Sequence, residues 1–427
     1  MFDVIIVGGG ASGFYAAINI AEIDPNLKIA ILEKGKHVLK KVRISGGGRC
    51  NVTNVESDPE KLIKNYPRGE KELLGPFYTY ASQDTVQFFE SRGVQLKTED
   101  DGRIFPISNS SQTIIDCLLT ETVRMGIKVF RQCALTRIEP VSREGQKRLW
   151  KVSTTKKEYE CEKVLLATGS NPKIWKLIEN MGHTIVPPVA SLFTFNIEDQ
   201  RISGIPGVST NAEVAILPRY NSGLESTGGS KRDKRQKSQL SAEGPILITH
   251  WGLSGPVILK LSAWGAILLN DLNYHFPIRI NWLPDYQLES ILSLLMEKKE
   301  INARKTVVKA RAVEFPRRLW TNLVKASGIS KDEKWADVSK GKLQNLAEQL
   351  TEGSYMVEGK STFKEEFVTA GGVELNEINF KTFESKIHKN LFFAGEVINI
   401  DAITGGFNFQ NAWTGAYIAA QAIAKDN

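Results

Sequence analysis

The stretch "DVIIVGGGASGFYAAINIAE" at residues 3–22 constrains the fold more than any other part of the sequence. An apolar run at residues 4–7 predicts a buried strand, and small residues at 14–21 predict a helix. Between them, Gly8, Gly10 and Gly13 match the pattern G-x-G-x-x-G. The first glycine permits a tight turn, the second lets a pyrophosphate approach the backbone, and the third lets the helix pack closely on the sheet. The stretch therefore predicts a dinucleotide-binding strand, turn and helix.

A second strand supports this interpretation. The run "LKIAILEKG" at residues 27–35 contains Glu33, twenty residues after Gly13. A carboxylate at this place can accept hydrogen bonds from the ribose hydroxyls of a dinucleotide. The glycine pattern together with Glu33 at this spacing disfavours the alternative, which is a glycine-rich turn beside an unrelated acid. The pattern by itself does not distinguish nicotinamide from flavin cofactors.

The C-terminal part repeats the arrangement of strand, acid, glycines and helix. Residues 391–394 predict a strand that ends in Gly395 and Glu396, and residues 407–424 predict a helix preceded by Gly405 and Gly406. Glu396 suits ribityl hydroxyls, and the helix start near Asn408 suits the pyrimidine edge of an isoalloxazine. A packing helix after a glycine turn is the alternative for this segment alone.

A middle strand at residues 164–167 ends in Thr168 and Gly169, as in flavoproteins with two dinucleotide folds. The ordered set of three motifs predicts a discontinuous FAD domain. Because no second G-x-G-x-x-G follows a strand, we expect no separate nicotinamide domain. NAD(P)H would then dock transiently on the flavin.

The stretch "ISGGGRCNVTN" at residues 44–54 has three interpretations: a linker, a cysteine site, or a cradle for the flavin. It holds one cysteine, with Thr53 and Asn54 where a second thiol would sit, so dithiol chemistry is excluded. The glycines at 46–48 would let the backbone approach the cofactor, and Lys41 and Arg49 would supply positive charge. We interpret the stretch as a flavin cradle lined or supported by Cys50 and Asn51.

Composition narrows the class of protein further. The four cysteines include no C-x-x-C pair and the five histidines no H-x-x-x-H, so we expect no metal site and no disulfide framework. No run of eighteen apolar residues predicts a membrane span, and the sequence begins without a signal peptide, which makes a cytoplasmic location the expectation. The formal net charge of +7 is compatible with nucleic acid or anionic cofactors and proves neither.

The chain resembles the BaiN/RdsA family of NAD(P)/FAD-dependent oxidoreductases over nearly its whole length. The resemblance is carried by "VIIVGGGASG", "KKVRISGGGRCNVTN", "ITHWGLSGPVIL", "VTAGGVELNEI" and "LFFAGEVINIDAITGGFNFQNAWTGA". It implies an α/β fold in which a discontinuous, Rossmann-like FAD-binding domain carries an inserted mostly β domain and a small helical domain. We expect the FAD domain at residues 1–186 and 363–427, the β domain at 187–284 and the helical domain at 285–362.

The candidate cofactor-binding residues combine these motifs with the resemblance. They are Gly8, Gly10, Ala11, Ser12, Gly13, Glu33, Lys34, Lys41, Ser45, Gly46, Gly47, Arg49, Asn51, Ala134, Ala167, Thr168, Gly169, Gly395, Glu396, Gly406, Phe407 and Asn408.

The family also implies an activity: hydride transfer through flavin N5 to reduce an activated C=C bond, with NAD(P)H as the reductant. One branch is associated with bile-acid enones, and another with dihydrouridine in large-subunit ribosomal RNA. Two alternatives stay open for this chain. It is a flavin-dependent oxidase or dehydrogenase of a small metabolite, or a flavoprotein with a mainly binding role.

Reduction of a C=C bond requires an acid that protonates the carbon opposite the hydride. Cys50 is one candidate, because its glycine-rich, arginine-flanked loop would favour thiolate character. A small buried residue near the flavin is the alternative. His250 in "ITHWGLSGP" is the second candidate, and a histidine satisfied at a strand-to-turn junction is its alternative.

A basic stretch is a candidate for contact with a macromolecular substrate. The run "GGSKRDKRQKSQL" carries Lys231, Arg232, Lys234, Arg235 and Lys237 with one acid, and these side chains could contact RNA phosphates. A solvated hairpin loop is the alternative. No aromatic residue interleaves with the charges, so stacking on bases is not expected.

Overall fold

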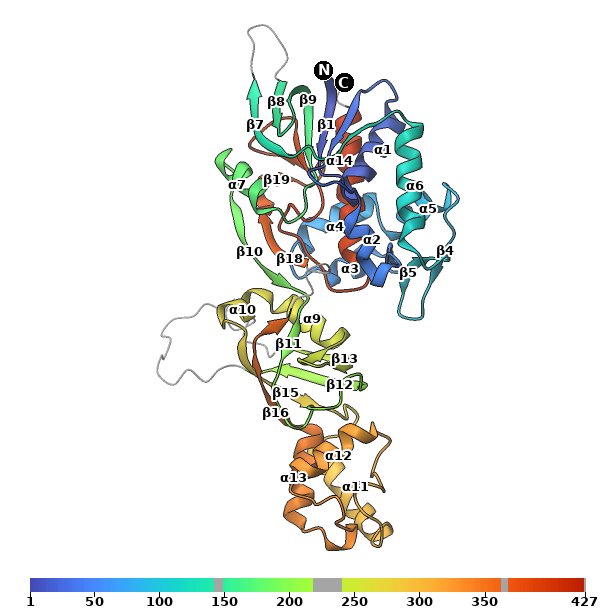
Figure 1. Cartoon of the computed structure of the whole chain (residues 1–427), viewed down its shortest axis with the longest axis vertical. Helices are drawn as coiled ribbons and strands as arrows, with labels where there is room; N and C mark the ends of the chain where they lie inside the picture. Colours follow the sequence, from blue (N-terminus) through green and yellow to red (C-terminus); the bar gives the residue numbers. More distant parts are fainter. Residues whose placement is uncertain (142–148, 218–239, 362–367, 426–427) are drawn as a thin grey trace. The chain divides into compact units, whose positions relative to one another are not determined.

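The chain forms two compact units (Figure 1). The computed structural model describes residues 1–141, 149–217, 240–361 and 368–425. The first unit comprises residues 1–189 together with 364–427, and the second unit comprises residues 190–363.

The elements of the first unit alternate between strands and helices. They are β1 (Phe2–Val7), α1 (Ala11–Ile23), β2 (Ile29–Leu32), α2 (Lys40–Ile44), β3 (Thr53–Asn54), α3 (Pro59–Leu62), α4 (Glu70–Thr79), α5 (Ser82–Glu90), β4 (Leu96–Thr98), β5 (Arg103–Pro106), α6 (Ser111–Arg124), β6 (Lys128–Phe130), β7 (Leu135–Val141), β8 (Leu149–Thr154), β9 (Glu158–Leu166), α7 (Pro172–Asn180), β10 (Ile185–Ser191), β18 (Val368–Val373), β19 (Ile378–Asn379), β20 (Glu384–Ser385), β21 (Leu391–Phe393) and α14 (Phe407–Lys425).

A parallel sheet in the order β6-β2-β1-β9-β21 forms the centre of the first unit. Ile5 of β1 is paired with Ala30 on one side and with Val164 on the other. β8 and β20 extend this sheet with antiparallel pairing. All four residues of β2 are buried, as expected for a parallel strand covered on both faces. The strands expected at 4–7, 164–167 and 391–394 are thus confirmed.

Helices α1 and α14 lie side by side in the first unit, although they are separated by more than 380 residues (Figure 1). Both helices are rich in buried alanines, such as Ala16 and Ala17 in α1 and Ala419 and Ala420 in α14. Small side chains let two helices approach closely, which explains the small-residue pattern of both segments.

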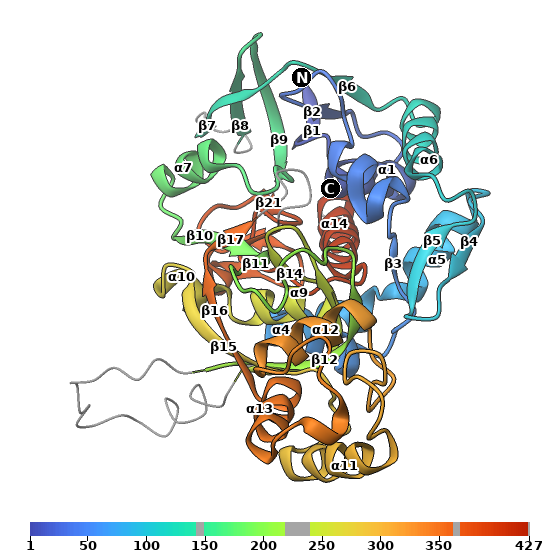
Figure 2. The same cartoon turned by 60° about the horizontal axis from the view of Figure 1, so that its bottom comes forward.

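The second unit contains an antiparallel sheet and a group of helices (Figure 2). Its strands follow the order β16-β15-β12-β13-β14-β11-β17. Its elements are β11 (Thr194–Asn196), β12 (Ser209–Ile216), β13 (Ser241–Ile248), β14 (Gly252–Ser254), α9 (Pro256–Trp264), α10 (Ala266–Asp271), β15 (His275–Asn281), α11 (Leu288–Ile301), α12 (Arg317–Ala326), α13 (Lys340–Thr351), β16 (Gly353–Glu358) and β17 (Lys360–Ser361).

Strands β16 and β17 fall inside the segment expected to be helical, residues 285–362. Six residues of β16 pair with β15, from Gly353 opposite Ile280 to Glu358 opposite His275. The chain thus leaves the sheet for α11–α13 and then returns to it. The sheet and the helices belong to one compact unit, and the proposed boundary between residues 284 and 285 stays a prediction.

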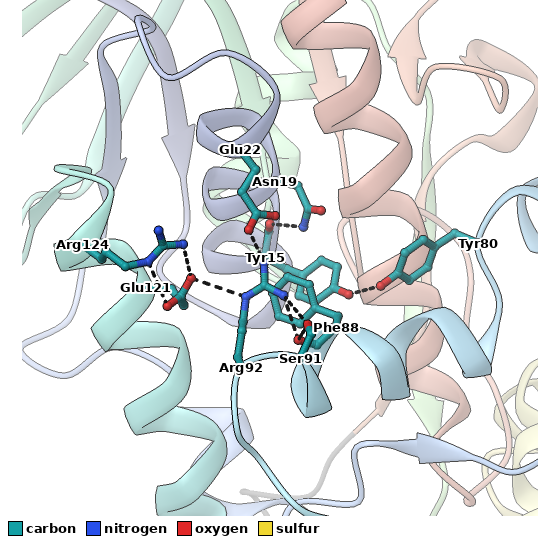
Figure 3. A network of polar contacts seen from close by, with 9 residues as sticks. All are labelled: Tyr15, Asn19, Glu22, Tyr80, Phe88, Ser91, Arg92, Glu121 and Arg124. Carbon is teal, nitrogen blue, oxygen red and sulfur yellow. Dashed lines mark hydrogen bonds and ion pairs between the residues drawn. The ribbon is translucent and has the colours of Figure 1, made fainter.

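Arg92 joins three helices of the first unit (Figure 3). Its guanidinium lies 3.7 Å from the centroid of the Phe88 ring and donates to the Phe88 carbonyl at 2.8 Å. It forms an ion pair with Glu22 of α1, and its Nε lies 3.5 Å from a carboxylate oxygen of Glu121 in α6. Only 13% of the Arg92 side chain is exposed, so this cation holds α1, α5 and α6 together with little solvent screening.

Within the described residues, every helix is too short or too polar to cross a bilayer.

We expect Arg92→Ala to destabilise the first unit by about 2 kcal/mol, because the change removes the charge-assisted hydrogen bonds of a largely buried guanidinium to Glu22 and to the Phe88 carbonyl. Urea unfolding of the purified protein measures this effect. Arg124→Ala is the matched control, since Arg124 pairs with the same Glu121 but is 60% exposed and should contribute far less. An equal loss in both variants would contradict the role given to Arg92.

Candidate functional site

The predicted cofactor residues of the first unit follow the carboxyl ends of its parallel strands. Gly8 follows β1, Glu33 follows β2, Ala167 follows β9 and Gly395 lies two residues beyond β21. In open α/β sheets of this kind, ligands bind in the crevice outside the carboxyl ends of the strands. The structure thus brings the separate motifs to one edge of one sheet.

Three glycines hold these motifs in such close contact that a side chain on any of the three would collide with a neighbouring atom. A Cβ on Gly8, which has a φ of +115°, would lie 2.2 Å from the carbonyl oxygen of Ala167. A Cβ on Gly13 would lie 2.0 Å from the Gly8 carbonyl oxygen, and one on Gly395 would lie 2.4 Å from Ser12 Oγ. The first turn therefore touches the middle strand, and α1 touches the end of β21.

Gly10 differs from these glycines, because a Cβ there would meet nothing within 4 Å. Its φ of −96° and ψ of −168° are open to any residue, so the fold itself does not require glycine at this position. Gly10 is also the N-cap of α1, without a side-chain capping hydrogen bond. Open space in front of a helix N-terminus that begins at Ala11 fits the phosphates of a dinucleotide.

The Glu33 carboxylate supports the first turn from the neighbouring strand. One oxygen accepts from the Gly9 N–H at 2.9 Å and the other from the Gly35 N–H at 2.6 Å. A carboxylate has about four acceptor positions, so Glu33 keeps capacity for ribose hydroxyls. The Cys133 N–H donates to the Glu33 carbonyl at 2.8 Å, which places Ala134 beside this strand end, whereas Lys34 is exposed.

Polar groups gather where β9 and β21 end. Lys41 of α2 forms an ion pair with Glu396. A Cβ on Gly169 would lie 3.7 Å from a Glu396 carboxylate oxygen. Thr168 Oγ1 is buried and has no hydrogen-bond partner among the described residues. A buried hydroxyl without a partner needs a polar group nearby, and the sugar and phosphate parts of FAD would supply one.

The glycine-rich loop turns sharply at Gly46 and Gly47, whose φ values are +56° and +66°. Ser45 Oγ donates to the Val42 carbonyl at 2.9 Å and fixes the entry to the loop. A Cβ on Gly47 would meet nothing within 4 Å, so this glycine faces open space, as expected for a cradle.

The cradle interpretation expects Arg49 to offer its positive charge to the cofactor, but its side chain contacts other residues of the protein. Its guanidinium lies 2.6 Å from the Glu99 carboxylate and 4.0 Å from the centroid of the Phe105 ring. These partners belong to the β4–β5 hairpin and its turn, so the structure commits the Arg49 charge to Glu99.

Cys50 is fully buried and has a positive φ of 61°. Burial raises the pKa of its thiol to about 12. The expected thiolate character is therefore wrong, because desolvation outweighs the Ser45 hydrogen bond that favours the charged form. Cys50 is present as a neutral thiol at physiological pH, which matches the alternative of a small buried residue.

Residues 51–54 are bound closely to residues 405–413, and we call this pairing the clamp. Asn54 Nδ2 donates to the Gly405 carbonyl at 3.0 Å, and Trp413 Nε1 donates to the Val52 carbonyl at 2.9 Å. A Cβ on Gly406, with a φ of +95°, would lie 2.5 Å from the Thr53 carbonyl oxygen. The clamp therefore attaches the cradle loop to the start of α14.

Side chains complete the clamp on both sides of Gly406. With its amide oriented to satisfy its neighbours, Asn51 accepts from the Gly406 N–H at 2.9 Å and donates to the Thr53 carbonyl at 2.9 Å. Thr53 Oγ1 donates to Gln410 Oε1 at 2.6 Å, and both residues are fully buried. Buried polar groups that satisfy one another in this way hold one arrangement of the backbone.

The start of α14 is held by two further contacts. The Asn408 side chain accepts from the Ala402 N–H and donates to the Ala402 carbonyl, both at 3.0 Å. The Phe407 carbonyl accepts from the Tyr66 hydroxyl at 2.6 Å. Asn408 therefore closes the preceding loop, and its side chain is engaged within the protein.

Sequence reasoning assigned no role to Asn54, Gln410 or Trp413, although they lie inside the motifs. Each acts through a partner more than 320 residues away in the chain. Covariation between the two motifs in an alignment is the signal that would reveal such pairs.

His250 lies in the second unit, in the turn between β13 and β14, and its side chain is exposed. Its neighbour Trp251 is 64% exposed. The proposed role of His250 as a proton donor stays a prediction. The basic residues Lys231, Arg232, Lys234, Arg235 and Lys237 lie outside the described residues.

Fold and site together define a Rossmann-type dinucleotide-binding protein of the FAD kind. A family model described as "HI0933-like protein Rossmann domain" matches residues 2–422, and the chain belongs to this family. Membership confirms the expected resemblance, the α/β fold class and the enzyme class of FAD-dependent oxidoreductases.

Individual relatives match over nearly their whole length. The chain is 26% identical to the "Ribosomal RNA dihydrouridine synthase" of Haemophilus influenzae, over 99% of this chain and 98% of the relative. It is also 26% identical to the "3-dehydro-bile acid delta(4,6)-reductase" of Clostridium scindens, over 98% of each. Among solved structures, the 3-ketosteroid delta1-dehydrogenase of Sterolibacterium denitrificans is similar with a TM-score of 0.47 and 11% identity over the full length of both chains.

We expect Gly10→Val to abolish retention of FAD while the protein still folds, because the added side chain fills open space in the cradle and the backbone accepts it. Absorbance of the purified protein near the flavin bands and its unfolding temperature measure the two effects. Gly75→Val is the matched control, since a Cβ on Gly75 in α4 also meets nothing within 4 Å. A yellow Gly10→Val protein would contradict the site.

We expect Cys50 to resist alkylation in the folded protein. Raising its pKa from 9.0 to about 12 lowers the thiolate fraction at pH 8 about a thousandfold, and burial adds a steric barrier. Between pH 7 and pH 9 its reaction with iodoacetamide should stay slow, whereas the rate in urea should rise with pH. Mass spectrometry measures both, with the less buried Cys117 as an internal comparison. Labelling of Cys50 at the unfolded rate would refute its neutral, buried state.

Proposed function

We propose that the protein is an NAD(P)H-driven, FAD-dependent reductase that converts uridine to dihydrouridine in ribosomal RNA. The observation that carries this proposal is similarity over 98% or more of the chain to two proteins named "Ribosomal RNA dihydrouridine synthase", from Haemophilus influenzae and Escherichia coli, at 26% and 27% identity.

The first unit fits FAD in the way that this activity requires. Gly10 and the start of α1 would face the pyrophosphate, Glu33 would accept from the ribose, and Glu396 with the start of α14 would lie toward the flavin end. When bound, FAD supplies hydride transfer, which is the chemistry of C=C reduction.

The residues of the glycine-rich loop limit which protein group can supply the proton for this reduction. Dihydrouridine forms when a hydride, provided by NAD(P)H, and a proton add to the two carbons of the uracil C=C bond. Cys50 is buried as a neutral thiol, and its pKa of about 12 makes it a poor acid. The glycine-rich loop holds Cys50 as its single cysteine, so this loop offers no dithiol relay between reductant and substrate.

A second candidate function is reduction of a small enone. It is favoured by the same identity, 26%, to the "3-dehydro-bile acid delta(4,6)-reductase" of Clostridium scindens. Both candidates add a hydride and a proton to an activated C=C bond, so they differ in the substrate alone. The predicted RNA contact through residues 231–237 and a cytoplasmic location belong to the first candidate.

The decisive experiment is nucleoside analysis of ribosomal RNA from a strain that lacks the gene for this protein. We expect dihydrouridine to fall in this strain and to return with the wild-type gene but not with Gly10→Val. Unchanged dihydrouridine would remove the RNA proposal. NADPH oxidation by the purified protein with a steroid enone, in the absence of RNA, would then support the second candidate.

A further inference from the structure

A basic segment of the second unit, residues 298–325, carries an unusual concentration of positive charge. It holds nine lysines and arginines against two glutamates, a net charge of +7. This value equals the formal net charge of the whole 427-residue chain, so all other residues together are balanced. The nine cations are Lys298, Lys299, Arg304, Lys305, Lys309, Arg311, Arg317, Arg318 and Lys325.

The basic segment has a defined fold. It leads from the end of α11 through an irregular connection into α12 (Figure 2). Trp320 Nε1 donates to the Val307 carbonyl at 3.0 Å, and Trp335 Nε1 donates to the Ala310 carbonyl at 2.9 Å. Val307 and both tryptophans are fully buried. These anchors fix the backbone of the connection against α12 and against the turn at residues 335–337, so the positions from which its charged side chains extend are defined.

The cations of the basic segment are available to a partner. Arg304, Lys305, Lys309, Arg317 and Arg318 are exposed. In the part of the chain that the structure describes, none of the five lies within ion-pair distance of a carboxylate. Their charges therefore face solvent without local neutralisation.

Folding alone does not explain where two of these cations lie. Arg317 and Arg318 are the first residues of α12, and the first turn of this helix contains no acidic residue. The positive end of a helix dipole favours carboxylates, so two arginines there oppose the stability of the helix. A negatively charged partner accounts for this arrangement.

We propose that the basic segment is a docking surface for RNA, which it binds through phosphates. This inference rests on the proposed function and names the surface that would hold the polymeric substrate. Charge complementarity points to a polyanion. The aromatic residues Phe315 and Trp320 are buried and offer no ring to a base, so the contacts are to the backbone of the RNA. Such contacts position RNA without reading its sequence.

A pair of charge variants tests this surface in the full-length holoprotein. The test variant combines Arg304→Gln, Lys305→Gln, Arg317→Gln and Arg318→Gln. The matched control combines Lys71→Gln, Lys128→Gln, Lys173→Gln and Lys389→Gln, four exposed lysines of the first unit. Both variants lose the same net charge. Filter binding to ribosomal RNA extracted from the strain without this gene gives the affinity at about 50 to 200 mM salt.

We expect the test variant to bind this RNA about a thousandfold more weakly at 0.1 M salt, because each of the four lost phosphate contacts no longer releases its roughly 0.7 to 0.9 counterions. The slope of log K against log salt should become less negative by about 3. The control should keep the wild-type affinity and slope. FAD content and the rate of flavin reduction by NADPH should be the same in all three proteins.

Equal affinity and slope in the test variant and the control would overturn the proposal, and so would absence of RNA binding by the wild type. Binding of the wild type to phosphatidylserine vesicles but not to RNA would overturn it as well. Should the test variant not fold, the double variant Lys305→Gln with Lys309→Gln replaces it, with an expected slope change of about 1.5. The protein can bind RNA through the basic segment while deletion of its gene leaves dihydrouridine unchanged. This combination would support the docking surface and refute the proposed function.

Discussion

The site depends on backbone contacts that leave no room for a side chain. Gly8 touches Ala167, Gly13 touches Gly8, Gly395 touches Ser12 and Gly406 touches Thr53, each within a distance that a Cβ would violate. Three of these contacts join segments that lie far apart in the chain, and the contact of Gly13 with Gly8 closes the first turn. The neighbours of Gly8, Gly13 and Gly406 are backbone oxygens, which cannot move aside as the Ser12 hydroxyl can, so these contacts determine how the strand ends meet. Open space remains in front of Gly10 and Gly47, and there we expect the cofactor to bind.

The parts of this arrangement that depend on local rules could be predicted from the sequence. The buried runs of β1, β9 and β21 are continuous and apolar because parallel strands are covered on both faces. Gly8 and Gly13 identify the turn because the backbone there excludes other residues. Glu33 was found by its spacing, and its carboxylate indeed lies under the first turn.

What the sequence did not predict depends on partners from other parts of the chain. Arg49 looked like a charge for the cofactor, but Glu99, fifty residues later, holds it. Cys50 looked activated by its neighbours in sequence, but its pKa follows from burial, which is a property of the tertiary fold. The clamp pairs, such as Asn54 with Gly405, are separated by 351 residues and have no local pattern. Side chains of β16 alternate between buried and exposed, but the exposed Met356 lies between Tyr355 and Val357 and hides this alternation in the sequence. Strand β17 has two residues, too few for any period.

The clamp also has a consequence for the order of events during synthesis. β21 and α14 follow residues 190–363 in the chain, so the ribosome completes every strand of the second unit before it makes the partners of residues 51–54. Until then β9 lacks its neighbour β21, and the carbonyls of Val52 and Thr53 have no α14 to meet. The nascent first unit must therefore wait in an incomplete state, with its cradle open, while about 170 intervening residues are translated. The candidate flavin site is therefore complete only when translation of the chain has ended.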